Sequence, residues 1–518
     1  MLKWLSGKDR AGHALANMAD AKALVAMLPP DDAVRAAHDA LQWLESITTS
    51  ASKFSMTHRY ALIDLIEAAL KRHGQRLLDE YLALKPQAKF QEGLYWRAAT
   101  GYWKALGDAY VGCIDPVARG ERDALALRAK LPQAVARAMR LQAVQIKWIL
   151  MRYGYVDASY WATVAKLYAQ AEAGAFLDDT IDFYEGARGR GTVRQEFLRV
   201  LMLSVSSAGG LSPVKQHIAE RAIAHFSKDF VFSSSADAGC NFIFDLSGAS
   251  APTRVLAATP RGARLIYFGA GQARDAAQRV VEVISATGAL PSELNFRPGD
   301  CDAVADTVRH LAFNWEKELP QRESERHKVA TTLQITQGFE GVLSMGSKVM
   351  QETWVVENVS AEGYGVIVPT RRGEWLQVGA LIGFRPEGNT AIWGAAVVRR
   401  IETDARGRCL VGIQALSRAV TPATMCARRN RSESGTPPNV VLLEAEPSRS
   451  GYLQVLVRPA SFTLGEALRV TRTADGLSFM LMPSGVIERT ADGLSFKLMP
   501  SGVIESGPDF ERVRLKAG

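Results

Sequence analysis

The spacing of apolar residues changes along this chain, and that change constrains the fold more than any other feature of the sequence. In the first part, apolar side chains recur every three or four positions, as at Leu62, Ile66 and Leu70, which places them on one face of an α-helix. After residue 320, short apolar runs alternate with glycines and polar turns, a pattern that is typical of β-strands. The sequence therefore predicts a multidomain α+β protein.

Residues 1–227 are predicted to form an all-helical scaffold domain. Pro29 and Pro30 end the first helix, and the acidic pair Asp31–Asp32 suits the N-terminus of the second, where acidic groups favour the helix dipole. The helices are predicted at residues 14–28, 33–47, 57–73, 133–152, 159–172, 177–187 and 213–225. The pattern by itself indicates no particular family. We expect such a helical array to bind a protein partner.

Residues 228–319 are predicted to form a short α/β segment that leads into a barrel. A strand at residues 264–268 runs through Gly269-Ala270-Gly271 into a helix at residues 273–286, which outlines a phosphate-binding turn. Arg274 stands where such a turn needs its third glycine, and no Walker lysine follows. An ordinary strand–helix turn is therefore the favoured interpretation. A further helix is predicted at residues 302–319.

Two short motifs mark the next region, residues 320–420. Arg322 and Arg326 form an R-x-x-x-R motif, and Asn358, Ser360 and Gly363 form an N-x-S-x-x-G motif. The planar fork of arginine pairs bidentately with phosphate and also matches the O6/N7 edge of guanine. Asn358 and Ser360 are two positions apart, so on a strand they face the same side. Gly363 allows either a close approach to a ligand or a turn with positive φ.

In this order the two motifs resemble those of the PilZ domain, a small β-barrel that binds the bacterial second messenger cyclic di-GMP. A W-x-x-x-x-V-x-R segment from Trp393 and a V-G-I-Q segment at residues 411–414 are also similar to the end of a PilZ domain. Short strands between glycines throughout this region fit a closed barrel. The resemblance covers residues 321–418.

The resemblance implies a ligand-binding role for each motif residue. Arg322 and Arg326 would clasp guanine and phosphate, while Asn358 and Ser360 would form hydrogen bonds and Gly363 would permit close approach. It also implies bacterial signalling outputs such as motility, pili and biofilm polysaccharide.

Two departures from the PilZ pattern concern affinity and stoichiometry more than fold. Gln321 stands where many PilZ domains have a further arginine. The interval between the motifs, which contains Gly338, Gly341 and Gly346, is also long.

The C-terminal part is predicted to be a linker followed by a small β-domain. The linker, residues 427–438, contains Arg428, Arg429 and Arg431 and is rich in Ser, Gly and Pro. The β-domain, residues 439–518, holds a 17-residue tandem repeat, in which residues 472–488 recur as 489–505 with one difference, Met480 against Lys497. We expect the repeat to form an added hairpin-like unit and assign it no chemical role.

The composition of the chain limits which partners and which cellular compartment we expect. The chain has 62 Lys and Arg against 54 Asp and Glu, a formal net charge of +8, which favours an anionic partner without choosing among nucleotide, nucleic acid and lipid. The five cysteines are scattered without a C-x-x-C pair, so neither a metal site nor a disulfide framework is expected. No signal-like start or long apolar run occurs. We expect a cytoplasmic protein with no membrane span.

The sequence lacks the signatures of the common enzyme classes. It contains no H-E-x-x-H, no G-x-S-x-G elbow and no paired carboxylates in a catalytic frame. It therefore predicts a receptor that binds cyclic di-GMP and relays the signal to a protein partner through the helical region. We expect this receptor to be no enzyme and to need no cofactor. Two alternatives remain open: a helical interaction scaffold with a non-binding barrel, and, less favoured, a basic nucleic-acid-binding protein.

Overall fold

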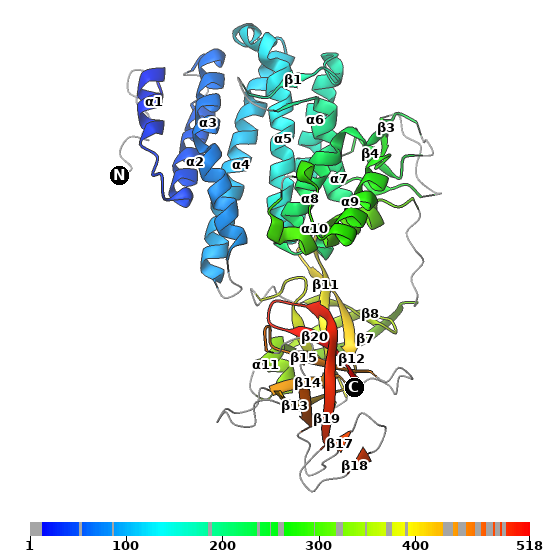
Figure 1. Ribbon diagram of the computed structural model, residues 1–518. Coiled ribbons are helices and arrows are strands. Elements are labelled where there is room, and N and C mark those ends of the chain that lie inside the picture. The colour runs from blue at the N-terminus through cyan, green and yellow to red at the C-terminus, as the bar shows by residue number, and fades with distance from the viewer. Residues whose placement is uncertain are drawn as a thin grey trace. The chain divides into compact units, whose positions relative to one another are not determined.

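The chain divides into two compact units, Met1–Pro320 and Gln321–Gly518, each with its own hydrophobic core. The computed structural model describes residues 13–50, 54–84, 88–184, 189–235, 239–248, 250–256, 264–294, 296–317, 325–345, 347, 350–368, 375–388, 392–427, 439–443, 452–461, 468–472, 480–481, 487–488 and 494–517. The predicted fold class is confirmed: a helical region, a short α/β segment, a closed β-barrel and a small C-terminal β-sheet follow one another (Figure 1).

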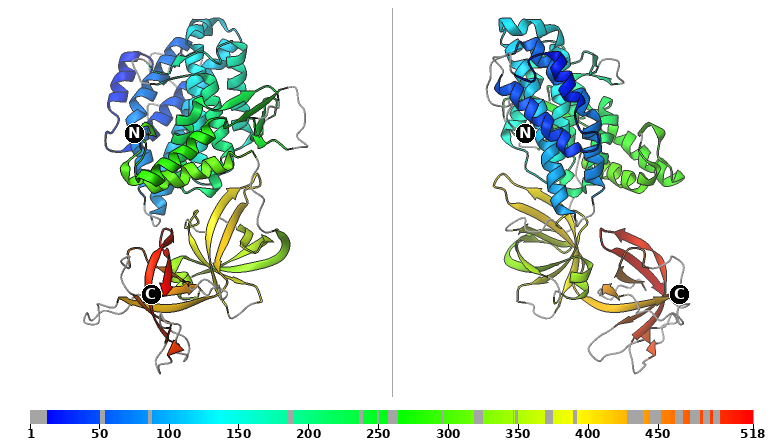
Figure 2. Two further views of the ribbon diagram at one scale, coloured as in Figure 1. Left: turned by 45° about the vertical axis from the view of Figure 1, so that its right-hand side comes forward. Right: turned by 90° about the vertical axis from the view of Figure 1, so that its left-hand side faces the viewer.

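Helices dominate the first unit. The described helices are α1 (Met18–Ala26), α2 (Ala33–Thr49), α3 (Met56–Leu82), α4 (Lys89–Ala118), α5 (Leu131–Leu150), α6 (Ala158–Ala173), α7 (Val193–Val205), α8 (Pro213–His225), α9 (Ala273–Thr287) and α10 (Cys301–Asn314). Helices α2, α4, α5 and α7 pack one against the next (Figures 1 and 2).

Short polar side chains cap the N-termini of many of these helices. They accept hydrogen bonds from backbone N–H groups that would otherwise lack partners. The capping residues are Asn17 (α1), Asp32 (α2), Ser55 (α3), Asp157 (α6), Thr192 (α7) and Ser212 (α8). Thr192 and Gln195 form a capping box, in which each side chain accepts the backbone N–H of the other at 3.1 Å. The predicted helices at 33–47, 57–73, 133–152, 159–172 and 213–225 thus start within two residues of observed ones.

Three differences separate the observed from the predicted helices, and two of them have a physical cause. The predicted helix at 177–187 is wrong, since Ile181–Asp182 (β1) pairs instead with Arg190–Gly191 (β2) and buries Ile181. The sequence pattern does not predict helix α4 because it contains four glycines, which lower helix propensity. A Cβ at Gly107 would lie 2.5 Å from the amide of Gln145, so the glycine permits close packing of α4 on α5. Helix α7 is also absent from the predicted set.

The α/β segment shares the core of the helices. Its antiparallel sheet has the order β3 (Val231–Ser233), β6 (Leu265–Gly269), β4 (Phe242–Asp245), β5 (Thr253–Arg254). The ring of Phe244 lies 5.9 Å from that of Trp161 on α6 and 5.8 Å from that of Phe197 on α7. The sheet is therefore packed on the helices by aromatic side chains.

The glycine turn between β6 and α9 is explained by packing. Gly271 has a φ of +52°, and a Cβ there would lie 2.5 Å from the carbonyl oxygen of Asp229. Arg274, at the start of α9, forms an ion pair with Glu316. Gly271 therefore permits a close backbone contact. This structural role favours an ordinary strand–helix turn over a phosphate-binding turn.

A group of buried charges joins three helices of the first unit. Glu220 of α8 accepts hydrogen bonds from Lys147 of α5 at 3.2 Å and from Arg199 of α7 at 3.0 Å. Arg199 also pairs with Glu196 on its own helix. Because a buried charge without a partner is costly, these pairs stabilise one relative placement of α5, α7 and α8.

The second unit begins with a closed six-stranded barrel. Its strands are β7 (His327–Gln337), β8 (Gln351–Val359), β9 (Gly363–Val368), β10 (Leu381–Pro386), β11 (Gly394–Thr403) and β12 (Cys409–Ser417), in the order β10-β11-β12-β9-β8-β7 with β7 paired to β10. Every pairing is antiparallel. The long interval between the two sequence motifs contains helix α11 (Gly338–Leu343).

A second sheet continues from the barrel. It comprises β13 (Val420–Ala427), β14 (Asn439–Leu443), β15 (Tyr452–Val457), β16 (Leu468–Arg472), β17 (Met480–Leu481), β18 (Ile487–Glu488), β19 (Leu494–Ser506) and β20 (Glu511–Ala517). Val397 of the barrel shares a core with Val441, Leu456 and Phe510 of this C-terminal sheet. Most of the second repeat copy lies in β19; residues 428–438 of the predicted linker, with its three arginines, lie outside the described residues.

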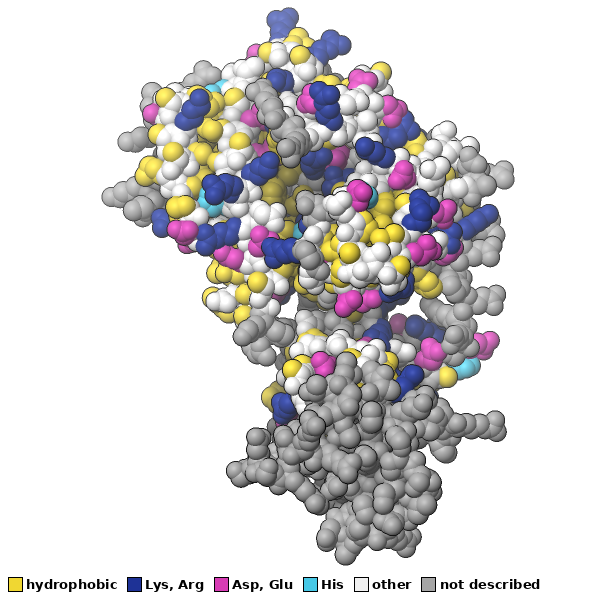
Figure 3. All heavy atoms as spheres, in the orientation of Figure 1, with side chains coloured by type: hydrophobic (Ala, Val, Ile, Leu, Met, Phe, Trp, Pro, Cys, Tyr) yellow, Lys and Arg dark blue, Asp and Glu magenta, His cyan; other side chains and the backbone are white. Residues whose placement is uncertain are grey.

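Two further observations concern the apolar character of the described helices and the charges on the surface of the first unit. None of these helices combines the length and the apolar character that crossing a bilayer requires. On the face shown in Figure 3, Lys and Arg side chains of the first unit are interspersed with Asp and Glu.

Candidate functional site

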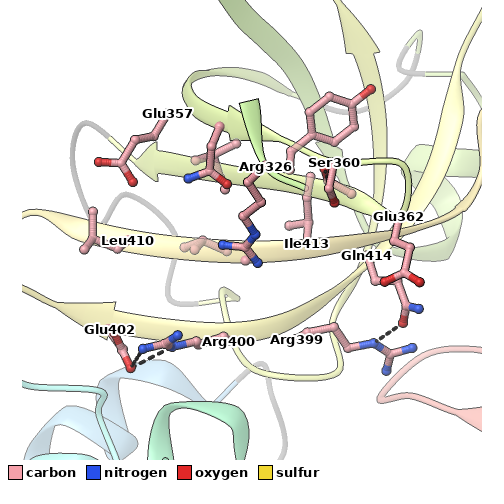
Figure 4. A pocket seen from close by; sticks show the side chains of 17 residues that line it. Arg326, Glu357, Ser360, Glu362, Arg399, Arg400, Glu402, Leu410, Ile413 and Gln414 are labelled. Atoms are coloured by element: carbon pink, nitrogen blue, oxygen red, sulfur yellow. Dashed lines mark hydrogen bonds and ion pairs between the residues drawn. The ribbon is translucent and has the colours of Figure 1, made fainter. Parts of the chain in front are cut away.

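A pocket of about 520 Å³ lies on the barrel over strands β8, β9, β12 and β11. The described charged residues that line it are Arg326, Glu357, Glu362, Arg399, Arg400 and Glu402 (Figure 4). This volume falls within the usual range for small-molecule sites. We therefore call it the candidate pocket.

A row of cross-strand partners forms the floor of the candidate pocket. Asn358 on β8 pairs with Gly365 on β9, Gly365 pairs with Gly412 on β12, and Gly412 pairs with Arg400 on β11. Directly opposed residues of antiparallel strands point to the same face of the sheet. Two polar side chains therefore flank two glycines, which leave the space between them open.

Gly365, one of the two glycines in this row, makes room for the side chain of Asn358. A Cβ at Gly365 would lie 2.7 Å from both Oδ1 and Nδ2 of Asn358. A Cβ at Gly412 would lie 3.5 Å from the Cβ of Arg400, an ordinary van der Waals distance. Gly365 thus allows the observed position of the Asn358 amide.

Two β-bulges increase the number of charged groups that face the pocket. The register shifts between Val356 and Asn358 on β8, and again between Val398 and Arg400 on β11. In a regular strand, consecutive residues face opposite sides. A bulge breaks this alternation, so the consecutive arginines Arg399 and Arg400 both line the pocket.

Four of the five residues predicted from the motifs line the candidate pocket together. Arg326 immediately precedes β7, Asn358 lies in β8, Ser360 lies in the β8–β9 connection and Gly363 starts β9. Figure 4 shows the Arg326 side chain extending over β12, with Ile413 beside it. The fifth residue, Arg322, lies outside the described residues.

Ser360 and Gly363 also have a structural role. The backbone N–H of Ser360 donates to the carbonyl oxygen of Gly363 at 2.9 Å, and its hydroxyl donates to the same oxygen at 3.4 Å. A Cβ at Gly363 would lie 2.0 Å from the carbonyl oxygen of Ile413 on β12. Gly363 does not have a positive φ. Close packing of β9 on β12, and not a left-handed turn, is therefore what requires glycine here.

The arginines of β11 already have polar partners. Arg399 donates from Nε to Gln414 Oε1 at 2.8 Å and from Nη2 to Glu505 Oε2 at 3.0 Å. Arg400 donates from Nε to Glu402 Oε1 at 2.7 Å. The two arginine side chains are 40% and 55% exposed. The Arg400–Glu402 pair is exposed on both sides, and such pairs contribute only about 0–1 kcal/mol, so an anionic ligand can replace Glu402. Glu505, the partner of Arg399, is only 17% exposed.

The motifs do not identify every polar group in the pocket. Arg399, Arg400 and Gln414 lie in segments that the sequence marks only by their similarity to a PilZ domain. The consecutive arginines are a visible signal, but a regular strand would turn one of them away. The bulge that brings both to one face is a property of strand register and has no signature in the sequence.

No cluster of metal-ligand side chains is found in the part of the chain that the structure describes. The described residues contain no group of three or more His, Cys, Asp or Glu side chains arranged to hold an ion.

One comparison with known families gives a match. The model of a family described as the N-terminal domain of the cyclic-di-GMP receptor FimW matches residues 19–237. The match covers the helical region, for which the sequence pattern indicates no family, and does not extend to the candidate pocket. No curated protein matches the chain.

Proposed function

We propose that this chain is a non-enzymatic receptor for cyclic di-GMP, with a PilZ-like barrel that binds the ligand in the candidate pocket. The observation that carries the proposal is the convergence of Arg326, Asn358, Ser360 and Gly363 on one pocket, although two separate motifs supply them. The family match supports the same ligand from a different part of the chain, since that family is named for a cyclic-di-GMP receptor.

The chemistry of the pocket suits this ligand. Cyclic di-GMP has two phosphates and two guanines, and arginine can form bidentate hydrogen bonds with either group. Arg326 extends over the floor of the pocket, where its guanidinium can face a phosphate or a guanine edge (Figure 4). The amide of Asn358 can both donate and accept hydrogen bonds. Arg322, four positions before Arg326 in the same motif, would supply a second arginine for the ligand.

The helical region is the proposed output module. It is a large, well-packed array that shares its core with the α/β segment, whereas the described residues that line the candidate pocket belong to the second unit. We assign ligand binding to the second unit and binding of a protein partner to the first. Ligand binding by the barrel would then be relayed to the partner of the helical region.

Calorimetric titration of cyclic di-GMP into the full chain tests the proposal. We expect micromolar or tighter binding that is weakened by about a hundredfold or more in Arg322→Ala/Arg326→Ala, because each charge-assisted contact contributes roughly 1.5–3 kcal/mol. Arg408→Ala is the matched control, since Arg408 is an exposed arginine of the same barrel that pairs with Asp404 outside the pocket. Absence of binding to the unmodified protein, verified by a second method, would refute the proposal.

A further inference from the structure

The arginine pair on β11 belongs to neither of the two predicted motifs, yet both side chains line the candidate pocket. The floor of the pocket separates this pair from the Asn358 side. Three strand intervals, from β8 through β9 and β12 to β11, span about 14 Å at the usual spacing. A ligand with a single anionic group would engage one side, whereas a ligand with two phosphates can engage both.

We propose that Arg399 and Arg400 form a second anion-binding element of the pocket, which Glu505 and Glu402 occupy until a ligand with two phosphates displaces them. This inference rests on the proposed function and names the residues that would hold the phosphate on the far side of the glycine floor. Figure 4 shows the two guanidinium groups turned apart, that of Arg400 toward Glu402 and that of Arg399 toward Gln414.

The balance of charge in the pocket supports an exchange of partners. Among the described residues, the charged lining contains three arginines and three glutamates, so without rearrangement this part of the lining offers a dianion no net positive charge. When Glu402 leaves Arg400, the guanidinium group can pair with a phosphate. A phosphate forms bidentate hydrogen bonds with arginine, which are stronger than the exposed pair that they replace. Because both members of this pair are substantially exposed, at 55% and 40%, separating them costs little.

Glu505 retains a partner when Arg399 leaves it. Glu505 Oε2 lies 3.7 Å from Nη1 of Arg512 on β20, in addition to its contacts with Arg399. Displacement therefore does not isolate the carboxylate. Glu505 is the last residue of the second repeat copy and belongs to β19, so the exchange would also release one polar contact between the barrel and the C-terminal sheet.

The test is titration of cyclic di-GMP into full-length variants whose folding is verified by thermal unfolding. Arg399→Ala and Arg400→Ala should each weaken binding by about tenfold or more, the usual effect of losing a charge-assisted contact. Glu402→Gln and Glu505→Gln should each tighten binding by about two- to fivefold, because they remove a competitor and a negative charge. This gain cannot be produced by a folding defect.

Two controls match these changes outside the pocket. Arg408→Ala breaks the Arg408–Asp404 pair of the β11–β12 hairpin, and Glu340→Gln breaks the pair of Glu340 on α11 with Arg458, another contact between barrel and C-terminal sheet. Both should leave affinity unchanged.

The outcomes separate this inference from the proposed function. Loss of binding in Arg326→Ala, with unchanged affinity in all four pocket variants, would overturn the second anion-binding element and leave the receptor function intact. Equal losses in Arg408→Ala and Arg400→Ala would also overturn it, since the effect would then be one of overall charge. No binding by the unmodified protein would overturn both.

Discussion

Asn358 and Gly365 face each other across strands β8 and β9, and any side chain at position 365 would collide with the amide of Asn358. A Cβ at this position would lie 2.7 Å from both terminal atoms of that amide. Gly365 is two residues beyond the glycine of the N-x-S-x-x-G motif. The structure thus indicates that the position of the motif asparagine depends on a glycine outside the motif.

Replacement of Gly365 by alanine should therefore impair ligand binding through Asn358. We expect Gly365→Ala to weaken binding of cyclic di-GMP by about tenfold, comparable to Asn358→Ala, because the contacts of one amide are lost in either case. The check is a double-mutant cycle by calorimetry. The double variant should bind no more weakly than either single variant. Additive losses would show that Gly365 acts independently of Asn358.

Gly363→Ala should act on stability and not only on binding. Its Cβ would lie 2.0 Å from the carbonyl oxygen of Ile413, and backbone cannot move aside as a side chain can. We expect a loss of about 3 kcal/mol or more in the free energy of unfolding, at the upper end for overpacking. Urea unfolding of the variant, compared with Gly365→Ala, measures this difference. Equal stability of Gly363→Ala and the unmodified chain would contradict the assigned strand contact.

Much of the fold could be predicted because local and tertiary preferences agree. Helix α8 follows a capping serine and a proline at its first turn, and its predicted limits match the structure. Helix α4 could not be predicted in this way. Its glycines are unfavourable for an isolated helix, and only their contacts with neighbouring helices, such as Gly107 with Gln145, explain them.

The candidate site could be predicted only as far as its motifs extend. Arg326, Asn358, Ser360 and Gly363 could be named from the sequence, and the structure places them around one pocket. The role of position 365 and the shared orientation of the two β11 arginines depend on strand pairing. Register and bulges are set by distant parts of the barrel, so no local pattern of residues discloses them.

The stability of the first unit should fall on mild acidification because of His217 on α8. Burial, together with nearby Lys147, lowers the pKa of His217 to about 4 from 6.5, although Glu220 opposes this. Between these values the unfolded chain binds a proton that the folded chain does not. The free energy of unfolding should therefore decrease as pH falls from 6.5 to 4, by up to about 3 kcal/mol.

Urea unfolding at several pH values between 4 and 7 tests the role of this histidine. His217→Gln should flatten the pH dependence in that interval. His225→Gln is the control, since His225 is exposed at the end of the same helix. An unchanged slope in His217→Gln would assign the effect to other groups.

Loss of Glu220 should destabilise the helical region strongly. Despite burial, which raises its pKa, Lys147 and Arg199 hold the pKa of Glu220 at about 2. Glu220→Leu leaves Lys147 buried without its carboxylate and should cost about 3–5 kcal/mol, as measured by thermal or urea unfolding. Adding Lys147→Met should recover most of this loss, because the uncompensated charge is then removed. A double variant no more stable than Glu220→Leu would refute this explanation.

Hydrogen–deuterium exchange of the full chain, with and without saturating cyclic di-GMP, would show directly whether the barrel binds the ligand. Binding in the candidate pocket predicts slower exchange in β8, β9, β11 and β12, whose residues line it. Because the family match to a cyclic-di-GMP receptor covers residues 19–237, the same experiment would reveal a site there. Protection confined to the helical region, or no change anywhere, would contradict the assignment of ligand binding to the barrel.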